Sequence, residues 1–161
     1  MAKTLLPTPE VLALLRENPR QIAALTAGLD AAALQTPPAP GQWSFNDILA
    51  HLRSCADVWG DCLARILSED NPTLRAMDPR TWTERTDYRT QPFRASFETF
   101  TAQRAALLAT LEPLTPEQWQ RAATVVGAGK PLVRTAHFYA RWLAEHERSH
   151  VKHIRRMVKA R

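Results

Sequence analysis

The sequence contains the pentapeptide His-Glu-Arg-Ser-His at positions 146–150, which matches the H-E-x-x-H pattern of zinc peptidases. If this segment is helical, His146 and His150 lie on one face at a spacing that a single metal ion can bridge. In a peptidase, Glu147 would be the general base and a third ligand would follow downstream. The alternative is a chance pair of histidines on a charged helix.

The residues after His150 argue against a peptidase. Only eleven residues follow, and none is Asp or Glu, so no downstream carboxylate can serve as the third ligand. The longer metzincin pattern requires glycine and histidine where this chain has His153 and Arg156. The sequence also predicts no sheet that would align an extended peptide. We therefore predict that the protein is not an H-E-x-x-H peptidase.

A second segment carries His51 at the edge of an apolar helical stripe, with Asp47 and Cys55 one turn to either side. The last helix repeats this arrangement, because His146 and His150 lie on the border of its core face. If the two helices are neighbours, three imidazoles can converge on one metal ion. The alternative is that each histidine is an ordinary half-exposed or hydrogen-bonded side chain.

The neighbouring carboxylates and thiols have competing interpretations. We expect Asp47 and Glu147 to support the metal ligands as a second shell. Asp47 could instead cap its helix, and Glu147 could pair with an arginine of a neighbouring helix. Cys55 and Cys62 are two helical turns apart, too far for a disulfide, and we expect reduced, inert thiols. A thiolate ligand from Cys55 would close the coordination sphere and make the metal structural.

Prolines and capping residues predict four long helices in one domain that spans residues 1–161. We expect a break or kink at Pro19, with Asn18 capping the segment that follows. The expected helices cover residues 8–28, 44–69, 92–112 and 132–159, with a short helix that starts at Thr115-Pro116 and a turn at 126–131. A long connection at 70–91 makes the predicted fold an all-α four-helix bundle with a crossover between the second and third helices.

Composition narrows the function classes. The chain has 161 residues, 45% of them hydrophobic, and a net charge of +5. Much of the positive charge is in the last ten residues, on the solvated end of the last helix, and no nucleic-acid-binding motif accompanies it. No apolar run is long enough for a membrane span, and the N-terminus does not look like a signal peptide. We expect a cytoplasmic protein that binds neither nucleic acid nor membranes.

Two segments together resemble the DinB-like superfamily (DinB/YfiT-like metalloenzymes, DinB_2 type). One is PPAPGQWSFNDILAHLRSCADVWGDCLARI, in which a Trp-Ser cap leads into a helix and His51 follows the serine by seven residues. The other is LAEHERSHVKHIRRM, with its H-x-x-x-H pair. The resemblance covers about residues 8–158. It implies an up-down-down-up bundle and a divalent metal, zinc or nickel, held by His51, His146 and His150.

The resemblance also implies functional properties. Three histidine ligands leave coordination positions open for water or substrate, which is typical of a reactive site. Relatives suggest a thiol S-transferase that joins a low-molecular-weight thiol to electrophilic small molecules, or a hydrolase, acting as a homodimer. The alternative is a non-catalytic metal-binding or dimeric stress-related bundle protein.

Overall fold

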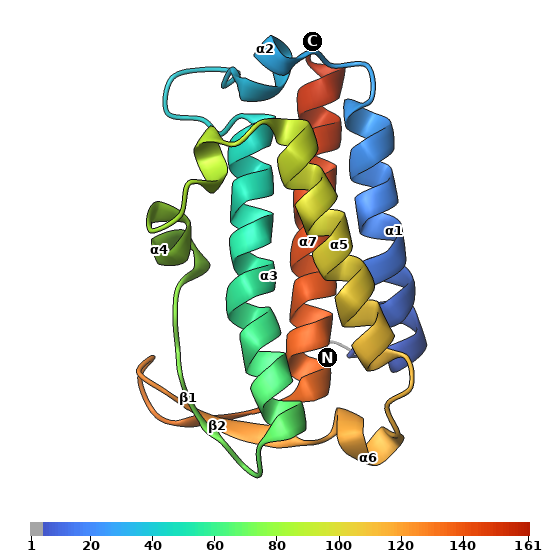
Figure 1. Ribbon diagram of the computed structural model, residues 1–161, viewed down its shortest axis with the longest axis vertical. Helices are drawn as coiled ribbons and strands as arrows, with labels where there is room; N and C mark the ends of the chain where they lie inside the picture. Colours follow the sequence, from blue (N-terminus) through green and yellow to red (C-terminus); the bar gives the residue numbers. More distant parts are fainter. Residues whose placement is uncertain (1–4) are drawn as a thin grey trace.

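The computed structural model describes residues 5–161, and four long helices form most of it (Figure 1). These helices are α1 (Thr8–Thr26), α3 (Phe45–Ser68), α5 (Phe93–Leu111) and α7 (Ala136–Lys159). The shorter elements are α2 (Ala31–Gln35), α4 (Pro79–Glu84), α6 (Pro116–Trp119), the 3-10 turn η1 (Tyr88–Thr90), and the strands β1 (Thr73–Arg75), β2 (Ala122–Val126) and β3 (Leu132–Thr135).

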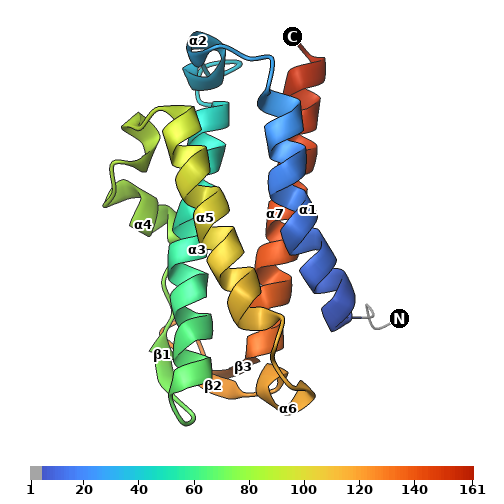
Figure 2. The same ribbon diagram turned by 45° about the vertical axis from the view of Figure 1, so that its right-hand side comes forward.

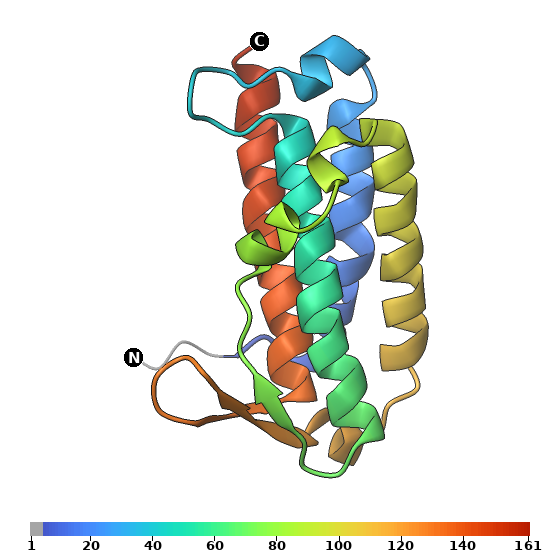
Figure 3. The ribbon, with the colours of Figure 1, turned by 60° about the vertical axis from the view of Figure 1, so that its left-hand side comes forward.

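The four long helices follow an up-down-down-up course (Figures 1 and 2). α1 and α7 ascend side by side, while α3 and α5 descend. After α3 the chain returns to the top of the bundle along the outside through β1, α4 and η1 (Figure 3). The predicted four-helix bundle with a long crossover is therefore confirmed. Because α3 and α7 are antiparallel neighbours, their histidine-bearing faces meet in the bundle.

A three-stranded sheet at the base of the bundle is a difference from the sequence prediction (Figure 3). β1 pairs with β2 in parallel, with Thr73 opposite Thr124, and β2 pairs with β3 in an antiparallel hairpin. The last helix was predicted to begin at residue 132, but it begins at Ala136. Thr135 caps it by accepting a hydrogen bond from the Phe138 backbone N–H at 3.0 Å. The residues from Leu132 to this cap pair with β2 as strand β3 instead.

The expected break at Pro19 is wrong, because α1 continues through this residue. Asn18 does not cap a second segment. Its side-chain amide is buried and donates a 3.0 Å hydrogen bond to the Ala144 carbonyl of α7. Packing against α7 therefore holds the helix together across the position where proline removes one backbone donor.

The start of α3 agrees with the sequence. Ser44 accepts a hydrogen bond from the Asp47 backbone N–H at 3.0 Å, and the Asp47 carboxylate accepts one from the Ser44 backbone N–H at 2.9 Å. This reciprocal capping box fixes the beginning of the helix two turns before His51.

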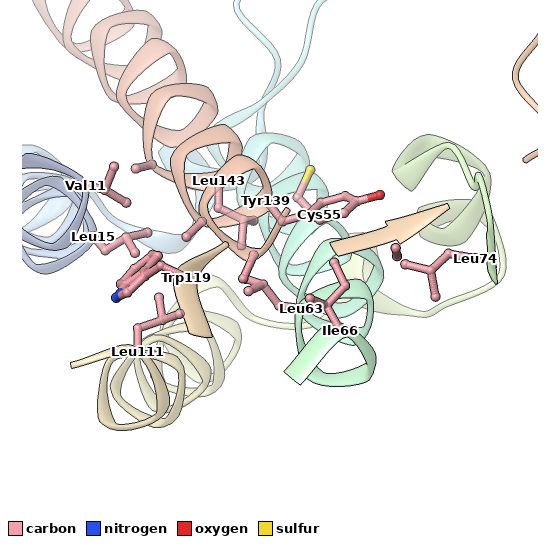
Figure 4. Close-up of a cluster of buried hydrophobic side chains, with 14 of the residues drawn as sticks. Val11, Leu15, Cys55, Leu63, Ile66, Leu74, Leu111, Trp119, Tyr139 and Leu143 are labelled. Atoms are coloured by element: carbon pink, nitrogen blue, oxygen red, sulfur yellow. The ribbon is translucent and has the colours of Figure 1, made fainter. Parts of the chain in front are cut away.

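Two clusters of buried hydrophobic side chains hold the helices together. The lower cluster joins side chains from all four long helices with β1 and α6 (Figure 4). The upper cluster lies around Phe45 and Phe100. Between residues 5 and 161, no helix is long and apolar enough to span a membrane.

Candidate metal centre

Three histidine side chains converge where α3 meets α7. The Nε2 atoms of His51, on α3, and His146, on α7, are 2.9 Å apart. The Nε2 atom of His150 lies 3.2 Å from that of His146. The ring centroids of His51 and His150 are 5.2 Å apart. The structure thus brings together the three histidines selected from the sequence.

Burial sets the charge state of these imidazoles. Burial, followed by the proximity of His146, lowers the pKa of His51 to about 4. Burial, followed by the proximity of His146 and His51, lowers the pKa of His150 to about 3. Burial also lowers the pKa of His146. All three rings are therefore neutral at pH 7, which leaves a lone pair on each ring for a metal ion.

The residues present fit a divalent metal ion. Four tetrahedral ligands at a typical Zn–N distance of 2.0–2.1 Å place ligand nitrogens about 3.4 Å apart. The two Nε2 separations given above are slightly shorter than this value, so small side-chain adjustments would admit an ion. The Nδ1 atom of His51 is buried and has no hydrogen-bond partner within residues 5–161. The three imidazoles therefore suit a metal ion. A metal-binding histidine usually donates its other ring N–H to a carboxylate, a carbonyl or water, and His51 lacks such a partner among the described residues.

Cys55 offers a different third ligand atom. Its Sγ lies 3.6 Å from the His51 Nε2 atom, and the ligand atoms of His51, Cys55 and His146 all lie within 4.8 Å of one another. His150 is outside this particular group, although it contacts His146. Burial strongly raises the pKa of the Cys55 thiol, which opposes the thiolate form that metals bind. Two overlapping ligand sets therefore meet at His51 and His146.

Asp47 does not contact the histidine cluster. Its carboxylate accepts hydrogen bonds from the backbone N–H and the hydroxyl of Ser44 and lies 3.8 Å from the Arg89 guanidinium. None of the hydrogen bonds found in the described part of the chain joins it to His51. The capping alternative thus accounts for Asp47, because its orientation is set by the start of α3.

Glu147 is also occupied elsewhere. It is fully buried and forms an ion pair with Arg104 of α5, and Asn18 of α1 approaches its other oxygen at 3.4 Å. This is the ion-pair alternative that the sequence left open. Because its carboxylate is held in the core by two other helices, Glu147 is not placed as the general base of a peptidase.

A pocket of about 340 Å³ opens onto the histidines. Its walls are Trp43, Trp59 and Trp142 together with the segment Asp78–Pro79–Arg80 that leads into α4. These residues were not predicted from the sequence as parts of a site. Trp43 and Trp59 flank His51 in the sequence, which was an available signal. The role of Asp78–Arg80 depends on the path of the crossover, which no local pattern reveals.

The remaining candidate residues lie away from the cluster. His137 is half-buried against the Trp119 ring, at a centroid distance of 6.0 Å, rather than pointing to solvent as its helical position suggested. His153 lines a separate cavity near the end of α7. Cys62 lines a cavity of about 460 Å³ between α3 and the crossover. That cavity is larger than the histidine pocket but does not contain the clustered ligand atoms.

Comparisons with known proteins find two similar sequences. The chain is 26% identical over 155 residues to a protein of Geobacillus thermodenitrificans (strain NG80-2) named "Putative metal-dependent hydrolase", covering 91% of this chain and 83% of that protein. A similarly named protein of Geobacillus kaustophilus (strain HTA426) is 25% identical with the same coverage.

A solved structure shows the same fold. YfiT from Bacillus subtilis, described as "a probable metal-dependent hydrolase with an unusual four-helix bundle topology", matches with a TM-score of 0.78 and 19% identity. The match covers 99% of this chain and 92% of that one. The family model of the DinB superfamily matches residues 14–154. Because that match spans most of the sequence, the chain belongs to the DinB superfamily.

Proposed function

We propose that the protein is a divalent-metal-dependent hydrolase of a small molecule, with His51, His146 and His150 as the metal ligands. The observation that carries this proposal is the convergence of three neutral imidazoles at a pocket of about 340 Å³. The names of the two Geobacillus relatives support hydrolysis. Zinc and nickel are the metals we propose, because imidazole ligands suit both.

The protein side chains have separate tasks in this proposal. The three histidines would hold the ion from two helices, beside the pocket. A bound divalent ion would polarise the substrate and acidify a water molecule. The three tryptophans shield the reacting centre from bulk water. Asp78 and Arg80 form the charged part of the pocket wall.

Transfer of a low-molecular-weight thiol to an electrophile is a second candidate, and one observation favours it. Asp78 is the only carboxylate among the described residues that line the pocket, and it caps α4 by accepting a 2.8 Å hydrogen bond from the Arg80 backbone N–H. One oxygen of this carboxylate is therefore already engaged in the cap, which weakens it as a base. A thiol, with an ordinary pKa of about 8.5, needs less help from a base than water does. Action as a cytoplasmic homodimer is part of the proposal in either case.

Metal analysis of the full chain, purified without a histidine tag, tests the proposal. We expect about one equivalent of zinc or nickel per chain in the wild type. His51→Ala, His146→Ala and His150→Ala should each weaken metal binding at least tenfold, because each removes one ligand. His137→Ala is the matched control, since His137 lies on the same helix as His146 but outside the pocket.

The metal-loaded protein and the three ligand variants are then assayed with two sets of substrates. Ester and amide panels test hydrolysis, and electrophiles supplied with a thiol such as cysteine test S-transfer. Turnover that disappears in all three ligand variants supports the proposal, and the active panel identifies the reaction. Equal metal content in all four histidine variants rules the three ligands out. Metal binding without turnover in either panel favours the non-catalytic alternative.

A further inference from the structure

Tryptophan is concentrated at the candidate centre. The chain has five tryptophans, and Trp43, Trp59 and Trp142 all line the histidine pocket. Their origins differ, since Trp43 precedes α3, Trp59 lies within α3 and Trp142 lies on α7. The fold therefore gathers three large aromatic rings around one small cavity.

The three rings are fixed relative to the histidines. Trp43 is stacked on His150, with 6.3 Å between ring centroids and 11° between planes. Trp59 packs edge-on against both His146, at 5.2 Å, and Trp142, at 5.7 Å. These contacts are the offset and edge-to-face geometries that aromatic rings prefer. The pocket wall is consequently a preformed aromatic surface beside the ligand nitrogens.

Trp142 is the exposed member of this wall. It keeps 42% of its surface exposed, although Phe138 stacks on it at a centroid distance of 5.9 Å. Ligand pockets are lined mainly by apolar and aromatic side chains, so an exposed tryptophan in a pocket wall is a candidate contact for a ligand. Asp78 and Arg80 carry opposite charges, and their side chains lie 3.7 Å apart. This pair therefore gives the pocket no preference for a positively or a negatively charged ligand.

The volume of the pocket limits the occupant. A dry apolar cavity of about 150 Å³ accommodates benzene, and pockets for drug-sized ligands begin near 300 Å³. A space of about 340 Å³ thus admits one ring together with the group that reacts. We infer that the substrates carry a planar aromatic group next to the reacting bond and that Trp142 determines this specificity. This inference rests on the proposed metal-dependent function.

Two hydroxamates test the inference on the zinc-loaded full chain. Both compounds bind a metal through the same hydroxamate group. Benzohydroxamate carries a phenyl ring where acetohydroxamate carries a methyl group. Isothermal titration should show benzohydroxamate binding about tenfold more tightly, because the ring gains burial and aromatic contacts. In Trp142→Ala the preference should fall below about threefold. Leu132→Ala should keep it, because Leu132 has a similar exposure, 40%, but does not line the pocket.

Failure of the inference and failure of the proposed function give different results. Equal affinity for the two hydroxamates in the zinc-loaded wild type overturns the aromatic preference and leaves the metal function standing. An unchanged preference in Trp142→Ala overturns the role of Trp142. If the wild type binds neither zinc nor nickel, the proposed function fails, and benzyl alcohol is then tested on the metal-free chain. Binding is measured by NMR as saturation transfer from the protein to the phenyl protons of benzyl alcohol. Transfer that is present in the wild type and absent in Trp142→Ala supports the aromatic site. The absence of transfer in the wild type overturns it.

Discussion

Cys55 and His150 compete for one role beside His51 and His146. The Cys55 side chain is completely buried, and burial strongly raises the pKa of its thiol. A thiolate there would be a poorly solvated charge. His150 is only half-buried and lines the pocket, so it can reach an ion that enters from that side. We therefore propose the all-histidine ligand set, which would leave coordination positions open.

Cobalt substitution distinguishes the two ligand sets. We predict that Cys55→Ser retains one equivalent of metal, because serine preserves the packing and no ligand is lost. The cobalt-loaded wild type should show no intense thiolate-to-metal absorption in the near ultraviolet. An intense band that disappears in Cys55→Ser would instead identify a closed, structural site.

Residues of the site differ in how well the sequence predicts them. His51, His146 and His150 were identifiable because helical periodicity places each at the edge of an apolar stripe, and the structure brings them together. The partner of Glu147 was not identifiable. Arg104 lies 43 positions away on another helix, and only the tertiary arrangement of the bundle decides their contact.

At the scale of elements, three helices meet at one buried polar group. The Glu147 carboxylate of α7 is paired with Arg104 of α5, and Asn18 of α1 approaches it and also donates to the Ala144 carbonyl. The Arg104 and Glu147 side chains are almost completely buried. Since every member would lose partners if a helix slid along its axis, this network holds α7 in the register that points His146 at His51.

Removing one member of the pair should be costly. We predict that Arg104→Met lowers the free energy of unfolding by about 3–5 kcal/mol, because Glu147 is left charged and unpaired in the core. The double variant Arg104→Met/Glu147→Leu should recover most of this loss, since it leaves no buried charge. Urea denaturation of both variants measures the difference. Equal destabilisation of the single and double variants would contradict this account.

The elements themselves were predicted unevenly. Capping signals such as Ser44 with Asp47 located the start of α3, because capping is a local interaction. The sheet was missed because its strands are three to five residues long, and β1 and β2 pair across the whole length of α5. Thr124, Val125 and Val126 are β-branched and gave a weak signal for a strand.

At the scale of the whole molecule, buried acidic groups make stability depend on pH. Burial raises the pKa of Cys62 on α3 and of Tyr139 on α7 above their ordinary values of 9.0 and 10.0. The unfolded chain therefore loses these protons at a lower pH than the folded chain does. Their contribution to stability is fully present below about pH 9 and is lost as the pH rises further.

We predict a melting temperature that is level between pH 7 and 8.5 and falls between pH 9 and 11. Differential scanning calorimetry across this range measures it. Tyr139→Phe should reduce the alkaline loss, because one of the groups with a raised pKa can no longer ionise. An identical alkaline loss in Tyr139→Phe and the wild type would show that other groups dominate.

The parallel course of α1 and α7 has an electrostatic consequence at the top of the bundle. Each helix has a dipole with its negative end at the C-terminus, and here two such ends lie at the same end of the molecule (Figure 1). α1 has no basic residue in its last turn, but Arg94 of α5 donates a 2.7 Å hydrogen bond to the Thr26 carbonyl. α7 carries its own Arg156 and Lys159. The basic residues at the end of α7, which supply much of the net charge, therefore offset the repulsion between the two negative helix ends. In a bundle whose neighbouring helices alternate in direction, this repulsion between neighbours would not arise.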